Sequence, residues 1–146
     1  TSRYQVGAIF NNTAGLTLAE KSQFKIDYAQ NLFDYKTIGM GVVVPMPFLV
    51  LGVGYHTYFS NDYTKVDAVS SGERPQINGY FSHSIDNFVL SFSPTKLPFI
   101  KYGLSLNYLK QTIDSDYVDT LGVDFGIKIP VFNGWIGVFS QNQRVR

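Results

Sequence analysis

The sequence predicts an all-β protein: an antiparallel β-barrel whose strands cross a membrane. Three observations predict this fold: apolar residues alternate with polar ones over long stretches, the alternating segments are long, and charged residues are few. Charged residues form 16% of the 146-residue chain, compared with about 25% in a typical soluble domain. Aromatic residues form another 16%, an enrichment that favours β-strands.

The alternation is clearest in the second half of the chain. Residues 121–129 carry Leu, Val, Phe, Ile and Ile at the odd positions, and Gly, Asp, Gly and Lys at the even positions. Because successive side chains of a strand point to opposite faces, this segment has one apolar and one polar face. The same rule, fully or partly obeyed, predicts eight strands, at residues 23–28, 37–44, 49–56, 76–84, 87–93, 100–108, 121–129 and 135–141.

Turn-forming residues lie between the predicted strands. Pro45 and Pro47 predict a tight turn between two neighbouring strands. The polar stretch from Asn61 to Pro75 is expected to be an extended loop, and residues 11–21 a second loop in which Thr17 to Glu20 forms a helical turn. Three further turns are expected at Asp86-Asn87, Asp114-Ser115-Asp116 and Asn133-Gly134.

The length of the predicted strands favours a membrane barrel over a soluble one. With their flanking residues, most of them extend over about 9–11 residues, which is what a tilted strand needs to cross a bilayer. Strands of soluble domains average about 5–6 residues. Residues 1–146 are therefore interpreted as one domain, either a barrel of about eight strands or a portion of a larger barrel.

The polar face of the predicted strands carries mainly glycine, serine and asparagine, with single charges between them. Such a face suits a crowded, hydrated barrel lumen. Asp124 and Lys128 are four residues apart on it and are expected to pair with Lys101 or Asn107 of the adjacent strand, as a structural charge network more than as a polar path. The expected lumen-facing polar residues are Lys25, Asp27, Lys101, Asn107, Asp124 and Lys128.

Aromatic residues gather near the ends of the predicted strands. Rings at such positions match the girdles with which bacterial barrels meet the two membrane interfaces. Membrane lipids are therefore the first expected partner. The aromatic residues concerned are Tyr28, Phe33, Tyr35, Tyr55, Tyr58, Phe59, Phe99, Tyr108 and Tyr117.

The composition also argues against several classes of function. A net charge of +1 gives no electrostatic basis for binding nucleic acid, and the absence of cysteine excludes disulfides and thiolate chemistry. His56 and His83 have no carboxylate at a metal-ligand spacing, and no serine lies in a Gly-x-Ser-x-Gly motif. We therefore expect no enzymatic activity, no cofactor and no metal site.

Four short segments carry a family resemblance. Three of them follow each other in the second half, at residues 102–110 (YGLSLNYLK), 122–127 (GVDFGI) and 137–142 (GVFSQN). In this order they resemble strands of the PorV/PorQ-type outer-membrane proteins, a group similar to the FadL-type long-chain fatty acid transporters. The fourth, Asn12-Thr13-Ala14-Gly15-Leu16, resembles the Asn-Pro-Ala-Gly-Leu element of that family, with Thr13 in place of proline.

The resemblance implies a place in the bacterial outer membrane. It also implies that Asn12, Ala14 and Gly15 lie near the lumen, where FadL-type proteins hold a plug and a ligand passage. Members of the family are longer, so the sequence is expected to be part of a larger barrel. The alternative is a small barrel of about eight strands that closes by itself and fills its interior with side chains.

The functions compatible with these patterns differ in partner. The leading expectation is transport of a hydrophobic small molecule, or service as an accessory of a secretion machine or of other outer-membrane proteins. Transport requires a continuous apolar surface inside the barrel. The alternatives are a structural surface subunit that packs against other chains through its sheet edges, and a soluble ligand-binding β-barrel. A soluble barrel would turn the alternating apolar residues toward one another in a dry centre.

Overall fold

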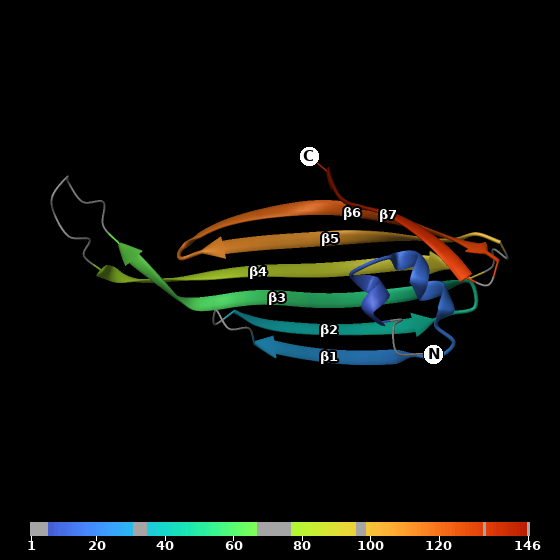
Figure 1. Cartoon of the computed structure of the whole chain (residues 1–146), viewed down its shortest axis with the longest axis horizontal. Helices are drawn as coiled ribbons and strands as arrows, with labels where there is room; N and C mark the ends of the chain where they lie inside the picture. Colours follow the sequence, from blue (N-terminus) through green and yellow to red (C-terminus); the bar gives the residue numbers. More distant parts are fainter. Residues whose placement is uncertain (1–5, 31–34, 67–76, 96–98, 133, 146) are drawn as a thin grey trace.

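The computed structural model describes residues 6–30, 35–66, 77–95, 99–132 and 134–145 (Figure 1). These residues form two short 3₁₀ helices followed by a single β-sheet. The elements are η1 (Val6–Ile9), η2 (Thr13–Leu18), β1 (Gln23–Gln30), β2 (Lys36–Pro45), β3 (Leu49–Val66), β4 (Ile77–Pro94), β5 (Lys101–Ile113), β6 (Asp116–Val131) and β7 (Gly134–Val145). In the described part of the chain, neither helix is long or apolar enough to cross a bilayer.

The seven strands follow one another in sequence order across the sheet. Every neighbouring pair is antiparallel, as in a series of hairpins, and the sheet curls like half of a barrel. This confirms the predicted all-β, antiparallel fold. Because β1 and β7 lie at opposite ends of the strand order, the described sheet stays open, and the self-closing small barrel is not the arrangement observed.

The number of strands is the main correction to the sequence prediction. Residues 76–84 and 87–93 are predicted to be two strands, but residues 77–84 and 87–93 belong to one strand, β4, and residue 76 lies outside the described residues. Asp86 and Asn87 do not form a turn, because they stand inside a ladder in which Thr57 and His56 of β3 are their partners. Pairing with β3 on one side and β5 on the other overrides the turn propensity of an Asp-Asn pair.

Two connections behave as predicted and two differ. β2 ends at Pro45 and β3 begins at Leu49, so the proline turn is confirmed, and Asp114 with Ser115 connects β5 to β6. Residues 61–66 extend β3 instead of starting a loop, whereas residues 67–76 lie outside the described residues. The helical turn near the N-terminus is η2, which begins four residues earlier than expected. Asn133, in the last predicted turn, also lies outside the described residues.

The strand register collects the alternating apolar residues on one face of the sheet. Val42, Val53, Leu90, Leu106 and Val123 are successive partners across five strands and form one such row. Their neighbours two positions along each strand form further apolar rows on both sides. Most of these side chains are exposed, so they do not converge in a dry centre.

The opposite face of the sheet is lined by small residues and is covered. Gly41, Gly54, Val89, Asn107 and Gly122 are successive partners there, and all five are buried. The covering element is the N-terminal segment, which we define as residues 6–18. Its helices contact β1 to β6, and Asn12 reaches Gly137 of β7. Because one short segment meets all seven strands, this is the concave face, and the exposed apolar rows lie on the convex face.

Candidate functional site on the concave face

The N-terminal segment is seated in two depressions made by glycine. In the first, Gly41, Gly52 and Gly54 lie under η1. A Cβ atom at Gly41 would stand 2.8 Å from a methyl carbon of Val6, and one at Gly54 would stand 2.6 Å from the ring of Phe10. Real Cβ atoms essentially never approach so closely, so a side chain at either position would force Val6 or Phe10 to move, and glycine allows the close packing.

The second depression receives the start of η2. Gly103 and Gly126 are directly opposite each other on β5 and β6. A Cβ atom at Gly103 would stand 2.5 Å from the carbonyl carbon of Thr13, and one at Gly126 would overlap the side chain of Asn12. The backbone of the segment therefore rests on the backbone of the sheet, which leaves no room for a side chain between them.

Hydrogen bonds fix the segment in this position. The side chain of Asn12 caps η2 by accepting a hydrogen bond from the Ala14 amide at 3.1 Å. The Oγ1 atom of Thr13 lies 3.0 Å from Oγ of Ser105, which in turn lies 3.0 Å from Oγ of Ser91. This buried chain of hydroxyls depends on Thr13, because the proline of the family element has no hydroxyl group. Ala14 is fully buried, and Gly15 approaches Ala8, which joins η2 to η1.

Replacing Ser105 by alanine should measure the strength of this hydroxyl chain. The variant leaves Thr13 and Ser91 without their shared partner, and both residues are buried. We expect Ser105→Ala to lower the free energy of unfolding by about 1–2 kcal/mol. Urea unfolding in detergent micelles measures the change, with Ser82→Ala at an exposed position as the control. Equal stabilities of the two variants would show that the chain of hydroxyls contributes nothing.

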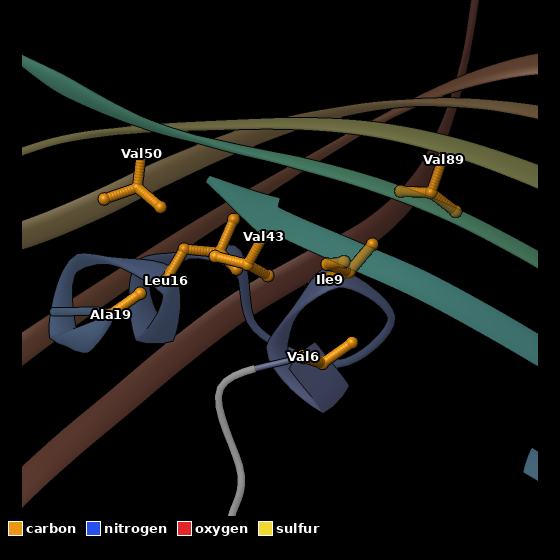
Figure 2. Close-up of a cluster of buried hydrophobic side chains, with 7 residues drawn as sticks. All are labelled: Val6, Ile9, Leu16, Ala19, Val43, Val50 and Val89. Atoms are coloured by element: carbon orange, nitrogen blue, oxygen red, sulfur yellow. The ribbon is translucent and has the colours of Figure 1, made fainter. Parts of the chain in front are cut away.

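The apolar core of the protein lies between the N-terminal segment and the sheet. Figure 2 shows side chains of the segment directed toward valines of the strands. Leu16 and Ile9 are almost completely buried, although each stands in a helix of only a few residues. The cluster consists of Val6, Ile9, Leu16 and Ala19, together with Val43 of β2, Val50 of β3 and Val89 of β4.

The structure places the six predicted polar residues on the concave side of the sheet by register, in three separate groups. Lys25 and Asp27 of β1 are opposite Gly41 and Gly39; they are exposed and pair with each other, with Nζ and Oδ1 2.6 Å apart. Asn107 is deeply buried in the middle of the sheet. Whether these residues face a lumen stays a prediction, because the described sheet is open.

The remaining three predicted residues lie on β5 and β6. Lys101 is directly opposite Lys128, whereas Asp124 is opposite Ser105 and so is directly opposite neither Lys101 nor Asn107. The Nζ atom of Lys128 lies 5.6 Å from the centre of the Trp135 ring, a distance typical of a cation–π contact. The sequence did not indicate this contact, because Trp135 comes from the next strand.

Two asparagines on the concave face have buried polar atoms. Asn107 is one of the predicted lumen-facing residues, whereas Asn87 was predicted only as part of a turn. Nδ2 of Asn107 and Oδ1 of Asn87 are buried without a hydrogen-bond partner among the described residues. The two residues occupy the concave face on adjacent strands, and Asn87 is opposite His56. Buried amides of this kind normally find a partner, so this part of the face has unused capacity for a polar ligand group or water.

The two histidines take part in separate contacts. The His56 ring lies 5.7 Å from the ring of Phe10 and 4.4 Å from that of Tyr58. Nε2 of His83 lies 3.1 Å from Nε2 of Gln111. Among the described residues, no group of three or more histidine, aspartate or glutamate side chains could hold a metal ion.

Comparisons with protein-family models, with curated proteins and with solved structures gave no match for this chain.

Proposed function

We propose that the chain is an outer-membrane β-barrel portion of the PorV/FadL-like type that transports hydrophobic compounds. One observation supports this most: the convex face exposes continuous rows of large apolar side chains, whereas the concave face is covered by the chain's own N-terminal segment. In water, so large an exposed apolar surface is unfavourable. In a bilayer the same arrangement is favourable, because the outer face of a membrane barrel contacts lipid. It also weighs against a soluble barrel.

The boundary of the apolar rows toward the end of β5 and the start of β6 supports the membrane assignment. Tyr55, Phe88 and Tyr108 are successive partners at this boundary on the convex face. The hydroxyl of Tyr55 donates a hydrogen bond to Asp86 at 2.6 Å, and that of Tyr108 donates one to Asp119 at 3.1 Å. Rings directed at the apolar side and hydroxyls at polar partners are the arrangement of an interfacial girdle.

The concave face supports transport over a purely accessory role. Beneath the N-terminal segment, Val43, Val50 and Val89 offer an apolar surface, with Ser91 and Ser93 beside it. A hydrophobic compound can bind there when the segment moves away, because the segment's own apolar side chains now occupy that surface.

Loosening the packing of the N-terminal segment against the sheet should therefore increase binding of an apolar probe. Leu16→Ser removes a fully buried apolar side chain from η2, at a cost of about 2–4 kcal/mol to the packing of the segment. We expect the variant, folded in detergent micelles, to bind an anthroyloxy-labelled long-chain fatty acid more tightly than the unmodified chain does. Fluorescence titration measures the dissociation constant.

The matched control is Leu18→Ser in the same helix. Leu18 is exposed, so this substitution has the same chemistry but leaves the packing of the segment largely intact. Transport by this route predicts tighter probe binding for Leu16→Ser alone. Unchanged or weaker binding in that variant would contradict it.

A second candidate function is a structural or secretion-accessory subunit, and the open sheet favours it. β1 and β7 form the edges of the described sheet, and β1 exposes Phe24, Ile26 and Tyr28 on the convex face. With seven strands, β1 and β7 run in the same direction, so purely antiparallel closure needs an odd number of additional strands between them. Strands of another protein could supply these edges with partners.

A further inference from the structure

Exposed phenylalanines mark the connections at one end of the sheet. Three connections lie at this end, after β2, β4 and β6, and each contains one phenylalanine. Phe48, Phe99 and Phe132 are 66%, 76% and 102% exposed. Because short connections normally carry Gly, Asn, Asp, Ser and Pro, an exposed aromatic ring in each of the three requires an explanation.

The backbone that carries two of these rings has a defined conformation. Phe132 has a φ of 48°, a left-handed conformation that a bulky side chain rarely adopts. In the connection after β2, the Met46 amide donates a hydrogen bond to the Leu49 carbonyl at 2.8 Å. The Thr95 amide and hydroxyl donate hydrogen bonds to the carbonyls of Phe48 and Pro47, at 3.1 and 3.2 Å, so the connections after β2 and β4 are joined.

The two ends of the sheet differ in charge. The connections after β2, β4 and β6 contain one charged residue, Lys96. Those after β1, β3 and β5 contain five, namely Asp34, Asp67, Glu73, Arg74 and Asp114. β3 and β4 also extend beyond their neighbours at the charged end, on the left of Figure 1, whereas the phenylalanines belong to the opposite end. The connections at the phenylalanine end are therefore the less charged ones, although Glu20 and Lys21, which precede β1, also lie at this end.

The height of the apolar rows indicates what this end contacts. On β6 the convex-face residues run from Leu121 to Ile129, which is about 27 Å along the strand and about 21 Å across a bilayer at a tilt near 40°. The lipid-facing band of membrane barrels is about 25 Å tall. The span from Leu121 to Phe132 corresponds to a height of about 28 Å across the bilayer. A lipid-facing band of about 25 Å that starts at Leu121 therefore ends between Ile129 and Phe132, at the connection that carries Phe132.

We propose that Phe48, Phe99 and Phe132 insert into one interface of the bilayer and set the depth of the barrel in the membrane. The proposal rests on the proposed function, since it needs the convex face to contact lipid. The rings contact the acyl chains next to the headgroups, while the backbone of the connections stays in the hydrated headgroup layer, where its polar groups are satisfied. Continuity with the convex apolar rows favours a lipid surface over a docking protein.

Depth-dependent fluorescence quenching tests this placement. The sequence contains one tryptophan, so Trp135→Phe gives a background without tryptophan. Into it are introduced, one at a time, Phe48→Trp, Phe99→Trp and Phe132→Trp. The references are Leu106→Trp in the middle of the convex apolar rows and Tyr117→Trp at the charged end. Each variant is folded into phosphatidylcholine vesicles whose acyl chains carry bromine either close to the headgroup or in mid-chain.

We expect the three phenylalanine variants to be quenched about twofold more by bromine close to the headgroup than by mid-chain bromine. Leu106→Trp should show the reverse order, and Tyr117→Trp little quenching by either. Quenching of fewer than two phenylalanine variants, with Leu106→Trp quenched, would overturn this inference and leave the proposed function standing. An unquenched Leu106→Trp variant would overturn both, because the convex face would then not contact lipid.

Discussion

Replacing Gly103 by alanine is expected to displace the N-terminal segment from the concave face. The new Cβ atom would stand 2.5 Å from the Thr13 carbonyl carbon and 2.7 Å from its carbonyl oxygen. Both atoms belong to the backbone, so no side-chain rotation can relieve the overlap. We expect Gly103→Ala to lower the free energy of unfolding by about 3 kcal/mol, the upper end of the range for overpacking.

Hydrogen exchange of the backbone amides in residues 6–18 is the most direct measurement of this effect. Displacement predicts loss of protection across both 3₁₀ helices, while the middle of the sheet stays protected. Gly7→Ala is the matched control, because a Cβ atom at Gly7 meets nothing within 4 Å. If the two alanine variants showed the same protection, close backbone packing at Gly103 would not be what holds the segment.

Replacing Leu106 by arginine is expected to destabilise the protein in a bilayer but not in water. Leu106 lies in the middle of the convex apolar rows and is 45% exposed. Arginine near the middle of a bilayer costs about 2–4 kcal/mol on the outer face of a membrane barrel. At an exposed position of a soluble sheet the same substitution changes stability by only about 0.5 kcal/mol.

Urea titration of folding into phosphatidylcholine vesicles separates these two cases. The control is Val118→Arg, at a position more exposed than Leu106 but located beyond the apolar rows at the charged end of β6. A membrane barrel predicts a large loss of stability for Leu106→Arg and a small one for Val118→Arg. Equal and small effects would favour the soluble barrel and remove the support for transport.

The positions of the strands could be predicted from the sequence because a strand leaves a local pattern. Alternation with a period of two residues requires only that the chain be extended and that its two faces meet different surroundings. Residues 100–108 and 121–129, the clearest examples, lie almost entirely within β5 and β6. The proline turn between β2 and β3 was equally local, since proline has no amide hydrogen to donate to a ladder and Pro45 is the last residue of β2.

The error at Asp86 and Asn87 shows where local reasoning fails. Both residues favour turns, and the sequence around them breaks into two short alternating stretches. In the structure they pair with Thr57 and His56 of β3, and with Lys110 and Leu109 of β5. A strand in the middle of a sheet is stabilised by two ladders at once, and no local pattern reports on either.

The candidate site was predictable in part. Asn12, Ala14 and Gly15 were singled out only through a family resemblance, and the structure places them where the N-terminal segment meets the sheet. Alternation placed the charged residues together on one face of the sheet, but it could not give the residue opposite each of them, such as Lys128 opposite Lys101. Sliding one strand by two residues changes every cross-strand partner but leaves each side chain on the same face, so alternation cannot detect it.

By itself the sequence determined that this protein is a β-sheet with one apolar and one small-residue face, because each strand carries that information within its own residues. Only the tertiary structure decided which chain segment covers the small-residue face and how the strands are matched. The bond between Thr13 and Ser105 joins residues 92 positions apart. Such a contact depends on the register of the four strands that come before β5 in the chain. It also depends on glycines that leave space for a segment far away in the sequence.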